Sequence, residues 1–270
     1  MTTLPDVLFV ALAAVAGPLL GYSVYWPAFR RLSEADPAWA RRWLWASNTA
    51  EQWMLVGFGA AIWMAAGRSW TSLGFVVPDG WRLWAAIALC LLVAGYFAYA
   101  VAVVARSADA RASVRQQFSG ELAAVLPASR TDMYWFSLVS LTAGFCEEFL
   151  WRGYLIWVLA PWLGWWGAAA LSLLMFALCH AYQGWRGILR TGIVGAIFTL
   201  LVAAFDSLWP AIVLHALVDL ANGLMAWLVL RERLADGKAV EGSRTAVSPG
   251  LGHRSGPGRD ESGVASDRHT

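Results

Sequence analysis

Residues 83–105 read LWAAIALCLLVAGYFAYAVAVVA, an unbroken apolar run without a charged side chain. A helix crosses the hydrocarbon core of a bilayer with about 20 mostly apolar residues, so this run is long enough to span a membrane. Six other runs meet the same requirement: Val7–Trp26, Trp43–Ala66, Met133–Leu159, Leu163–Tyr182, Ile188–Phe205 and Trp209–Leu230. The sequence therefore predicts an all-α fold, a polytopic transmembrane helix bundle with about seven spanning helices.

The composition of the 270-residue chain fits a protein whose outer surface faces lipid. Hydrophobic residues make up 59% of the chain and charged residues 14%, whereas a soluble domain carries roughly 25% charged residues. The mean hydropathy is +0.54, and a soluble fold of this length could not bury so much apolar surface. The eighteen tryptophans agree, because indole rings collect where a membrane meets water. The lipid bilayer is thus the first expected partner, and a net charge of only +2 gives no indication of nucleic acid.

Basic residues lie in alternate loops of the predicted bundle. The loops after the first, third and fifth predicted spans, and the segment after the seventh, hold Arg30, Arg31, Arg41, Arg42, Arg106, Arg111, Arg115, Arg130, Arg186, Arg190, Arg231, Arg233 and Lys238. The other loops hold only Arg68 and Arg82. Cytoplasmic loops carry an excess of Lys and Arg, so the N-terminus is expected outside and the C-terminus inside. Arginine in place of nearly all lysine favours a prokaryotic chain, and hence its inner (plasma) membrane.

Four segments follow from this pattern. Residues 1–105 form an N-terminal three-helix membrane part, 106–132 a polar cytoplasmic connector and 133–231 a four-helix core. Residues 232–270 are rich in Gly, Ser, Arg, Asp and Pro and cannot bury enough apolar area to offset the entropy of ordering, which predicts a disordered cytoplasmic tail. The first apolar run is interpreted as a retained helix rather than a secretory signal, because no Lys or Arg precedes it and it continues to Trp26.

Ionisable side chains inside the hydrocarbon are costly and point to function, and they gather in the last four predicted spans. The fourth span contains Glu147, Glu148 and Arg152. Glu148 and Arg152 are four residues apart, so they share a helix face and can pair. Glu147 lies about 100° around the helix and points elsewhere.

Both histidines outside the tail belong to the same constellation. His180 closes the fifth predicted span, and His215 shares a face of the seventh with Asp219, four residues further on. The other two histidines, His253 and His269, lie in the tail. Carboxylates and imidazoles together supply what peptide hydrolysis needs: a base for water, donors for the oxyanion and an acid for the leaving amine. This grouping favours a functional site over isolated structural histidines.

The order of these residues resembles a known family. The three motifs Glu147-Glu148-x-x-x-Arg152, Phe176-x-x-x-His180 and His215-x-x-x-Asp219 are similar to those of the CPBP (Abi) family of intramembrane endopeptidases, which is related to the type II CAAX prenyl proteases. The resemblance covers about Tyr134–Leu230 and includes residues 149–155 (FLWRGYL) and 207–212 (SLWPAI). In eukaryotic members the substrate is a prenylated C-terminal C-a-a-X tail.

The resemblance implies a role for each residue of the first two motifs. Glu147 would be the general base that activates water, and His180 would assist it. Glu148 would be a structural support that Arg152 holds in place.

At the third motif the resemblance implies that His215 and Asp219 stabilise the tetrahedral intermediate. The family often has Asn at the second of these positions, whereas this chain has Asp219. An amide can donate a hydrogen bond to an oxyanion, and an ionised carboxylate cannot. Three roles therefore stay open for Asp219: a protonated donor, an orienting partner of His215, or a metal ligand.

Two chemistries also stay open for the site. Glu147, His180 and His215 can ligate Zn²⁺ and leave one position for water. Without metal, Glu147 and His180 would polarise water directly while His215 faces the oxyanion. The chain has no H-E-x-x-H pair of a classical zinc protease, whereas Asp219 favours zinc slightly, since a carboxylate orients a ligating imidazole.

We therefore predict an intramembrane endopeptidase that hydrolyses a peptide bond of a membrane-associated protein or peptide. The alternative is a non-catalytic membrane protein, such as an immunity factor, a scaffold or a small transporter, that uses the same buried charges for structure or proton coupling. Asn48, Glu51 and Gln52 share one face of the second predicted span. Three interpretations stay open for them: they line a polar cavity, they are hydrated at the membrane interface, or they form a helix–helix hydrogen bond.

Overall fold

The computed structural model describes residues 1–118 and 121–246, and it describes the side chains of residues 1–118 and 123–231. Within these ranges the chain is helical and has no strand. The chain divides into two compact units, Met1–Arg233 and Leu234–Thr270. The three motifs lie within the first unit.

The N-terminal half begins with a long helix that alternates between α-helical and π-helical turns. It is followed by α4 and α5 and by two short helices. The bounds are α1 (Leu4–Ala11), η1 (Leu12–Ala16), α2 (Gly17–Leu20), η2 (Gly21–Tyr25), α3 (Trp26–Ala35), α4 (Pro37–Ala65), η3 (Trp70–Leu73), α5 (Gly80–Arg106), α6 (Ala108–Gln117) and α7 (Glu121–Ala124).

The C-terminal half contains the segment with the three motifs. Its elements are α8 (Arg130–Glu147), η4 (Glu148–Leu155), α9 (Ile156–Cys179), η5 (Ala181–Gln183), α10 (Gly184–Phe205) and α11 (Trp209–Ala246). Within α9 the backbone turns at Gly164, whose φ of 67° is favourable only for glycine. This turn separates the fourth predicted span from the fifth.

Five segments of the described chain are long and apolar enough to cross a membrane: Leu4–Ala35, Gly80–Arg106, Arg130–Cys179, Ala181–Phe205 and Trp209–Arg231. The third of these is 50 residues long and holds two predicted spans on either side of Gly164. Helix α4 coincides with the second predicted span but is not among these five segments. It carries Arg41, Arg42 and Glu51. The predicted all-α polytopic bundle is confirmed.

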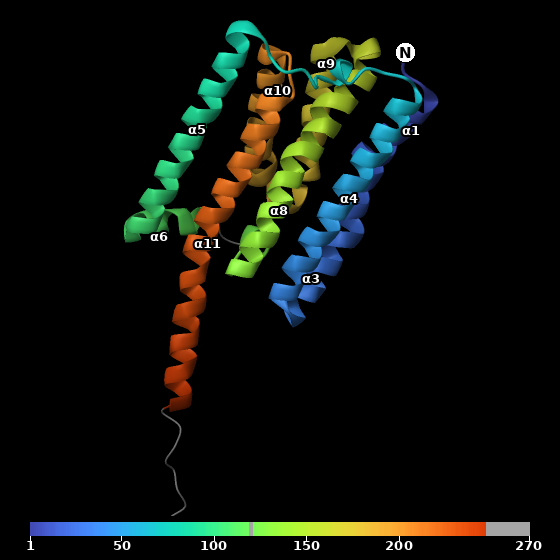
Figure 1. The fold of residues 1–270 in the computed structure, drawn as a ribbon. Coiled ribbons are helices and arrows are strands. Elements are labelled where there is room, and N and C mark those ends of the chain that lie inside the picture. Colours follow the sequence, from blue (N-terminus) through green and yellow to red (C-terminus); the bar gives the residue numbers. More distant parts are fainter. Residues whose placement is uncertain (119–120, 247–270) are drawn as a thin grey trace, which may run out of the picture. The chain divides into compact units, whose positions relative to one another are not determined.

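Helices α4 and α8 lie side by side and run in the same direction (Figure 1). Near their N-terminal ends, Arg41 Nη2 pairs with Asp132 Oδ2 at 2.9 Å. Further along, Trp53 Nε1 donates to Thr142 Oγ1 at 3.1 Å. The Arg41–Asp132 ion pair and the stacking of the Trp53 ring on Phe145 at 5.5 Å fix the register of α4 against α8.

Helix α8 also makes a close approach to α11 at Gly144. A Cβ atom at this position would lie 2.7 Å from the Cβ of Ala216 and 2.9 Å from its backbone nitrogen. Only glycine permits this separation, because carbon atoms in contact normally stand about 3.5–4.0 Å apart. The approach brings the residues after Gly144 close to His215, the neighbour of Ala216.

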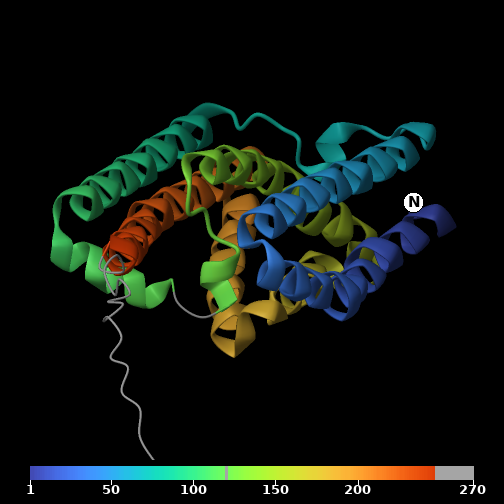
Figure 2. The same ribbon diagram turned by 90° about the horizontal axis from the view of Figure 1, so that it is seen from below.

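The start of α11 is held by the loop that follows η3. The backbone N–H of Leu208 donates to the Gly74 carbonyl at 2.8 Å, and Ser207 Oγ donates to the Val76 carbonyl at 2.6 Å. Helix α11 also lies beside α5 (Figure 2). Between them Val104, Leu228 and Val229 form a buried cluster. These contacts set the position of the helix that carries His215.

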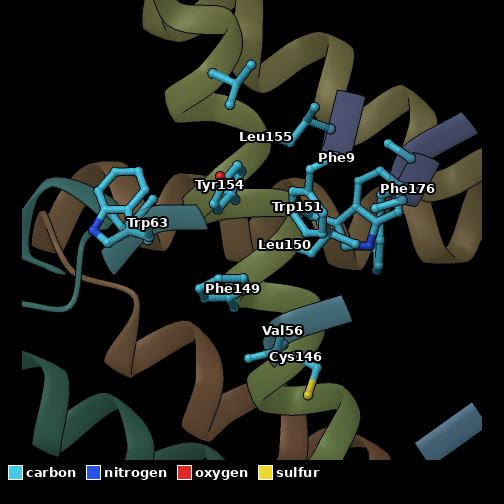
Figure 3. Close-up of a cluster of buried hydrophobic side chains, with 14 residues drawn as sticks. Phe9, Val56, Trp63, Cys146, Phe149, Leu150, Trp151, Tyr154, Leu155 and Phe176 are labelled. Carbon is cyan, nitrogen blue, oxygen red and sulfur yellow. The ribbon is translucent and has the colours of Figure 1, made fainter. Parts of the chain in front are cut away.

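A core of mainly aromatic and aliphatic side chains joins the N-terminal helix, α4 and η4 (Figure 3). Its centre holds Trp63 and Tyr154, both fully buried. The Tyr154 hydroxyl donates to Asp6 Oδ1 at 2.6 Å, and both carboxylate oxygens of Asp6 pair with Arg68 at 2.7 Å. A buried carboxylate is tolerated when it is paired and hydrogen-bonded in this way, so the network anchors the N-terminal helix to η4.

The predicted connector and tail differ in how far they are described. The connector, 106–132, contains α6 and α7. Helix α11 continues to Ala246, past residue 232 where the sequence predicts a disordered tail, so the backbone of 232–246 is helical and differs from that prediction. The rest of the predicted tail, 247–270, lies outside the described residues.

Candidate active site

The first motif lies where α8 becomes the π-helical segment η4. Glu147 is the last residue of α8, and Glu148 opens η4. The sequence predicts an α-helix here, whereas the structure has i→i+5 hydrogen bonding, a rare geometry that occurs often at functional sites. The predicted pair forms all the same, because Arg152 Nη1 lies 2.9 Å from Glu148 Oε1. Both side chains are buried.

Glu148 also contacts His215, which the sequence analysis did not foresee. His215 Nδ1 lies 2.8 Å from the same Oε1 atom that Arg152 contacts. An ionised carboxylate only accepts hydrogen bonds, so Nδ1 carries the hydrogen in this contact. The imidazole ring stacks on Phe198 at a centroid distance of 5.1 Å. Ring position and tautomer are thereby fixed, and Nε2 is the nitrogen left for chemistry.

Two further carboxylates face that nitrogen. Glu147 Oε2 lies 3.8 Å from His215 Nε2, and Asp219 Oδ2 lies 3.7 Å from it. Both separations exceed a direct hydrogen bond, and a water molecule can bridge polar atoms at such distances. Glu147, His215 and Asp219 are therefore brought together by α8 and α11.

His180 is placed differently. Helix α9 ends at Cys179, earlier than the predicted end at Tyr182, and His180 caps it. Its Nδ1 donates to the Phe176 carbonyl at 3.0 Å, since a carbonyl can only accept. Within the described part of the chain, His180 makes no hydrogen bond or ion pair with Glu147, His215 or Asp219. It shares only a cavity with them.

That cavity has a volume of about 1160 Å³, above the roughly 300–1000 Å³ of typical small-molecule sites. Aromatic side chains form much of its wall, among them Tyr22, Tyr25, Trp26, Trp151, Phe176 and Tyr182. Its polar lining includes Asn48, Glu51, Gln52, Glu147, His180, His215, Asp219 and Asn222, together with Ser47, Gln117, Gln183, Arg190 and Thr191. A cavity of this size and lining can hold a peptide segment beside the carboxylates and imidazoles.

Helix α4 contributes directly to this polar region. Gln52 Nε2 donates to Glu147 Oε1 at 3.1 Å and to Asn48 Oδ1 at 3.0 Å. Of the three interpretations that the sequence left open for the polar face of α4, the cavity lining and the helix–helix hydrogen bond both apply. The shared face of Asn48, Glu51 and Gln52 was the available signal, although nothing in the sequence indicated Glu147 as the partner.

The predicted zinc ligands are not gathered as a ligand set. In the described residues no three His, Cys, Asp or Glu side chains are placed to hold a metal ion together. Glu147 and His215 approach each other, but His180 does not join them. Zinc ligation by Glu147, His180 and His215 therefore stays a prediction.

The fold and the site together define an integral membrane helix bundle with a buried carboxylate–imidazole cluster on the wall of a large cavity. Residues 129–221 match the family model described as type II CAAX prenyl endopeptidase Rce1-like. This stretch contains all three motifs. This match relates the chain to the CAAX proteases, as the motifs predict. No curated protein and no solved structure matches the chain significantly.

Proposed function

We propose that the protein is an intramembrane endopeptidase that hydrolyses a peptide bond of a membrane-associated protein or peptide. The observation that carries the proposal is the placement of His215 Nε2 between Glu147 Oε2 at 3.8 Å and Asp219 Oδ2 at 3.7 Å, on the wall of the large cavity. A water molecule and a peptide carbonyl can approach this cluster from the cavity. The relation to the CAAX proteases supports the same reaction class.

Glu147 acts as the general base. Its Oε2 atom accepts a proton from a water molecule, whose oxygen attacks the carbonyl carbon of the scissile bond. The carboxyl then passes that proton to the nitrogen of the leaving amine as the C–N bond breaks. The reaction consumes one water molecule and forms a carboxyl group and an amine.

His215 stabilises the oxyanion of the tetrahedral intermediate. Its Nδ1–H is held by Glu148, and Glu148 is held by Arg152. When the ring carries both protons, each nitrogen has a carboxylate within 4 Å. Nε2–H can then donate to the developing negative charge, and the fixed ring needs little reorganisation.

Asp219 and His180 have supporting roles in this scheme. The Nδ1 of His215 is oriented by Glu148, so Asp219 is not needed for that task and instead lies 3.7 Å from Nε2, where a water molecule can join the two groups. His180 keeps Nε2 available for proton exchange, because its Nδ1 is engaged by the Phe176 carbonyl. It assists the reaction from its place on the cavity wall through intervening water.

The test is cleavage of a quenched fluorescent peptide by purified protein in liposomes. One form of the peptide carries a farnesylated cysteine that is followed by three C-terminal residues. A second form has the same sequence without the farnesyl group. Wild-type protein is expected to cleave a peptide bond, and Glu147→Gln and His215→Ala are each expected to lower kcat by at least about 100-fold. Thr142→Val, which removes a hydrogen bond outside the cluster, should keep activity. No cleavage of either peptide by wild type, or full activity of Glu147→Gln, would contradict the proposal.

A further inference from the structure

The N-terminal helices contribute a side chain to the cluster although the family match begins at residue 129. Gln52 on α4 donates through Nε2 to Glu147 Oε1 at 3.1 Å. The second hydrogen of the same amide goes to Asn48 Oδ1 at 3.0 Å. Since a carboxylate offers no hydrogen, the amide nitrogen of Gln52, and not its oxygen, must face Glu147.

We infer that Gln52 is a positioning residue for the general base, a role that rests on the proposed endopeptidase function. By occupying Oε1 of Glu147, it leaves Oε2 as the oxygen that faces His215 Nε2. The carboxylate plane is then fixed with one oxygen turned toward the water. Asn48 prevents the amide from turning over, because it takes the hydrogen on the other side.

The packing of α4 against α8 holds Gln52 close to Glu147. Arg41 and Asp132 pair near one end of the α4–α8 interface. The ring of Trp53, the neighbour of Gln52, stacks on Phe145 of α8 at 5.5 Å. With the register fixed at both places, Gln52 can reach only the end of α8, where Glu147 lies.

The positioning role predicts a loss in the chemical step and not in substrate binding. Gln52→Met keeps the length and flexibility of the side chain but has no donor. We expect kcat for the peptide probe to fall about tenfold, with KM within about twofold of wild type. The matched control is Thr142→Val, which loses an α4–α8 hydrogen bond that does not reach Glu147. Thr142→Val should keep the wild-type kcat even if its thermal stability falls as much as that of Gln52→Met.

An infrared measurement provides a second readout that does not depend on turnover. The carboxylate stretch of Glu147 is isolated as the difference between wild type and Glu147→Gln. Loss of the Gln52 hydrogen bond should shift this band in Gln52→Met, and Thr142→Val should leave it in place.

The outcomes separate this inference from the proposed function. If Glu147→Gln is inactive while Gln52→Met keeps both the wild-type kcat and the wild-type band position, the positioning role is wrong and the endopeptidase stands. A rise in KM at constant kcat overturns the role as well, because it places Gln52 in substrate binding. Should Glu147→Gln cleave the probe normally, the proposed function and the inference fail together.

Discussion

The contact between Gly144 and Ala216 sets the distance between the helices that carry Glu147 and His215, and Gly144→Ala tests its importance. The new methyl group would meet the Ala216 Cβ at 2.7 Å and its backbone nitrogen at 2.9 Å. A relaxed carbon–carbon contact needs about 3.5–4.0 Å, so α8 and α11 must separate by about 1 Å. Backbone atoms oppose the methyl group, so a rotamer change cannot relieve the clash.

The expected loss follows from that displacement. Overpacking of this kind destabilises by about 1–3 kcal/mol, and a misplacement of about 1 Å in a catalytic cluster can lower the rate about 100-fold. We expect Gly144→Ala to lower the unfolding temperature in detergent and kcat for the peptide probe together. Adding Ala216→Gly should recover only part of both, because the contacts to the Ala216 nitrogen and Cα, at 2.9 and 3.0 Å, remain.

The matched control is Gly57→Ala. Gly57 is also inside a helix, α4, and a Cβ atom there would meet nothing within 4 Å. Replacing it should leave kcat unchanged and stabilise the helix by roughly 0.5–1 kcal/mol. If Gly144→Ala behaves like Gly57→Ala in both measurements, the close approach does not control the site and the reasoning is refuted.

Other predictions concern charge, metal and topology. Arg152→Ala should lower the free energy of unfolding by about 3–5 kcal/mol, because Glu148 would lose the guanidinium group that pairs with its buried charge and would keep only the contact with His215. Arg152→Ala with Glu148→Gln should recover much of this loss, and equal stability of all three proteins would contradict the pairing. The proposed metal-free scheme predicts that cleavage survives exhaustive chelation and that Asp219→Asn keeps or raises turnover, because an amide can donate to the oxyanion. A zinc enzyme would instead lose activity to chelators and bind metal about 10- to 100-fold more weakly in Asp219→Asn. A reporter fused after Leu230 should be cytoplasmic and one at residue 2 external; the opposite result would reverse the proposed N-out, C-in orientation.

The sequence was sufficient for features that depend on local spacing. Apolar length predicted the helices, since spanning the hydrocarbon sets a minimum run of about 20 residues. The four-residue spacing predicted the Glu148–Arg152 pair, which forms at 2.9 Å. It also placed His215 and Asp219 on one helix face, where they lie 3.7 Å apart. These relations hold within one helix and need no knowledge of how helices pack.

Contacts between helices could not be predicted in the same way. The bond from His215 to Glu148 depends on how closely α11 approaches α8, and a single glycine, Gly144, decides that distance. The bond from Gln52 to Glu147 depends on the register of α4 against α8. The sequence was read with α-helical periodicity throughout. It therefore predicted neither the π-helical geometry of η4 nor the early end of α9 at Cys179. Tilt, register and local changes of helix type are properties of packing, and a single sequence does not display them.

The central claim is that Glu147 directs a water molecule onto a peptide carbonyl. Its most direct test is a cleavage reaction in water enriched in oxygen-18, followed by mass spectrometry of both products, for wild-type protein and Glu147→Gln in liposomes. With Glu147 as the general base, we expect one heavy oxygen in the new carboxyl group formed by wild type, none in the amine product, and no product above background with Glu147→Gln. Product formed by Glu147→Gln at the wild-type rate, with the same label, would contradict the claim.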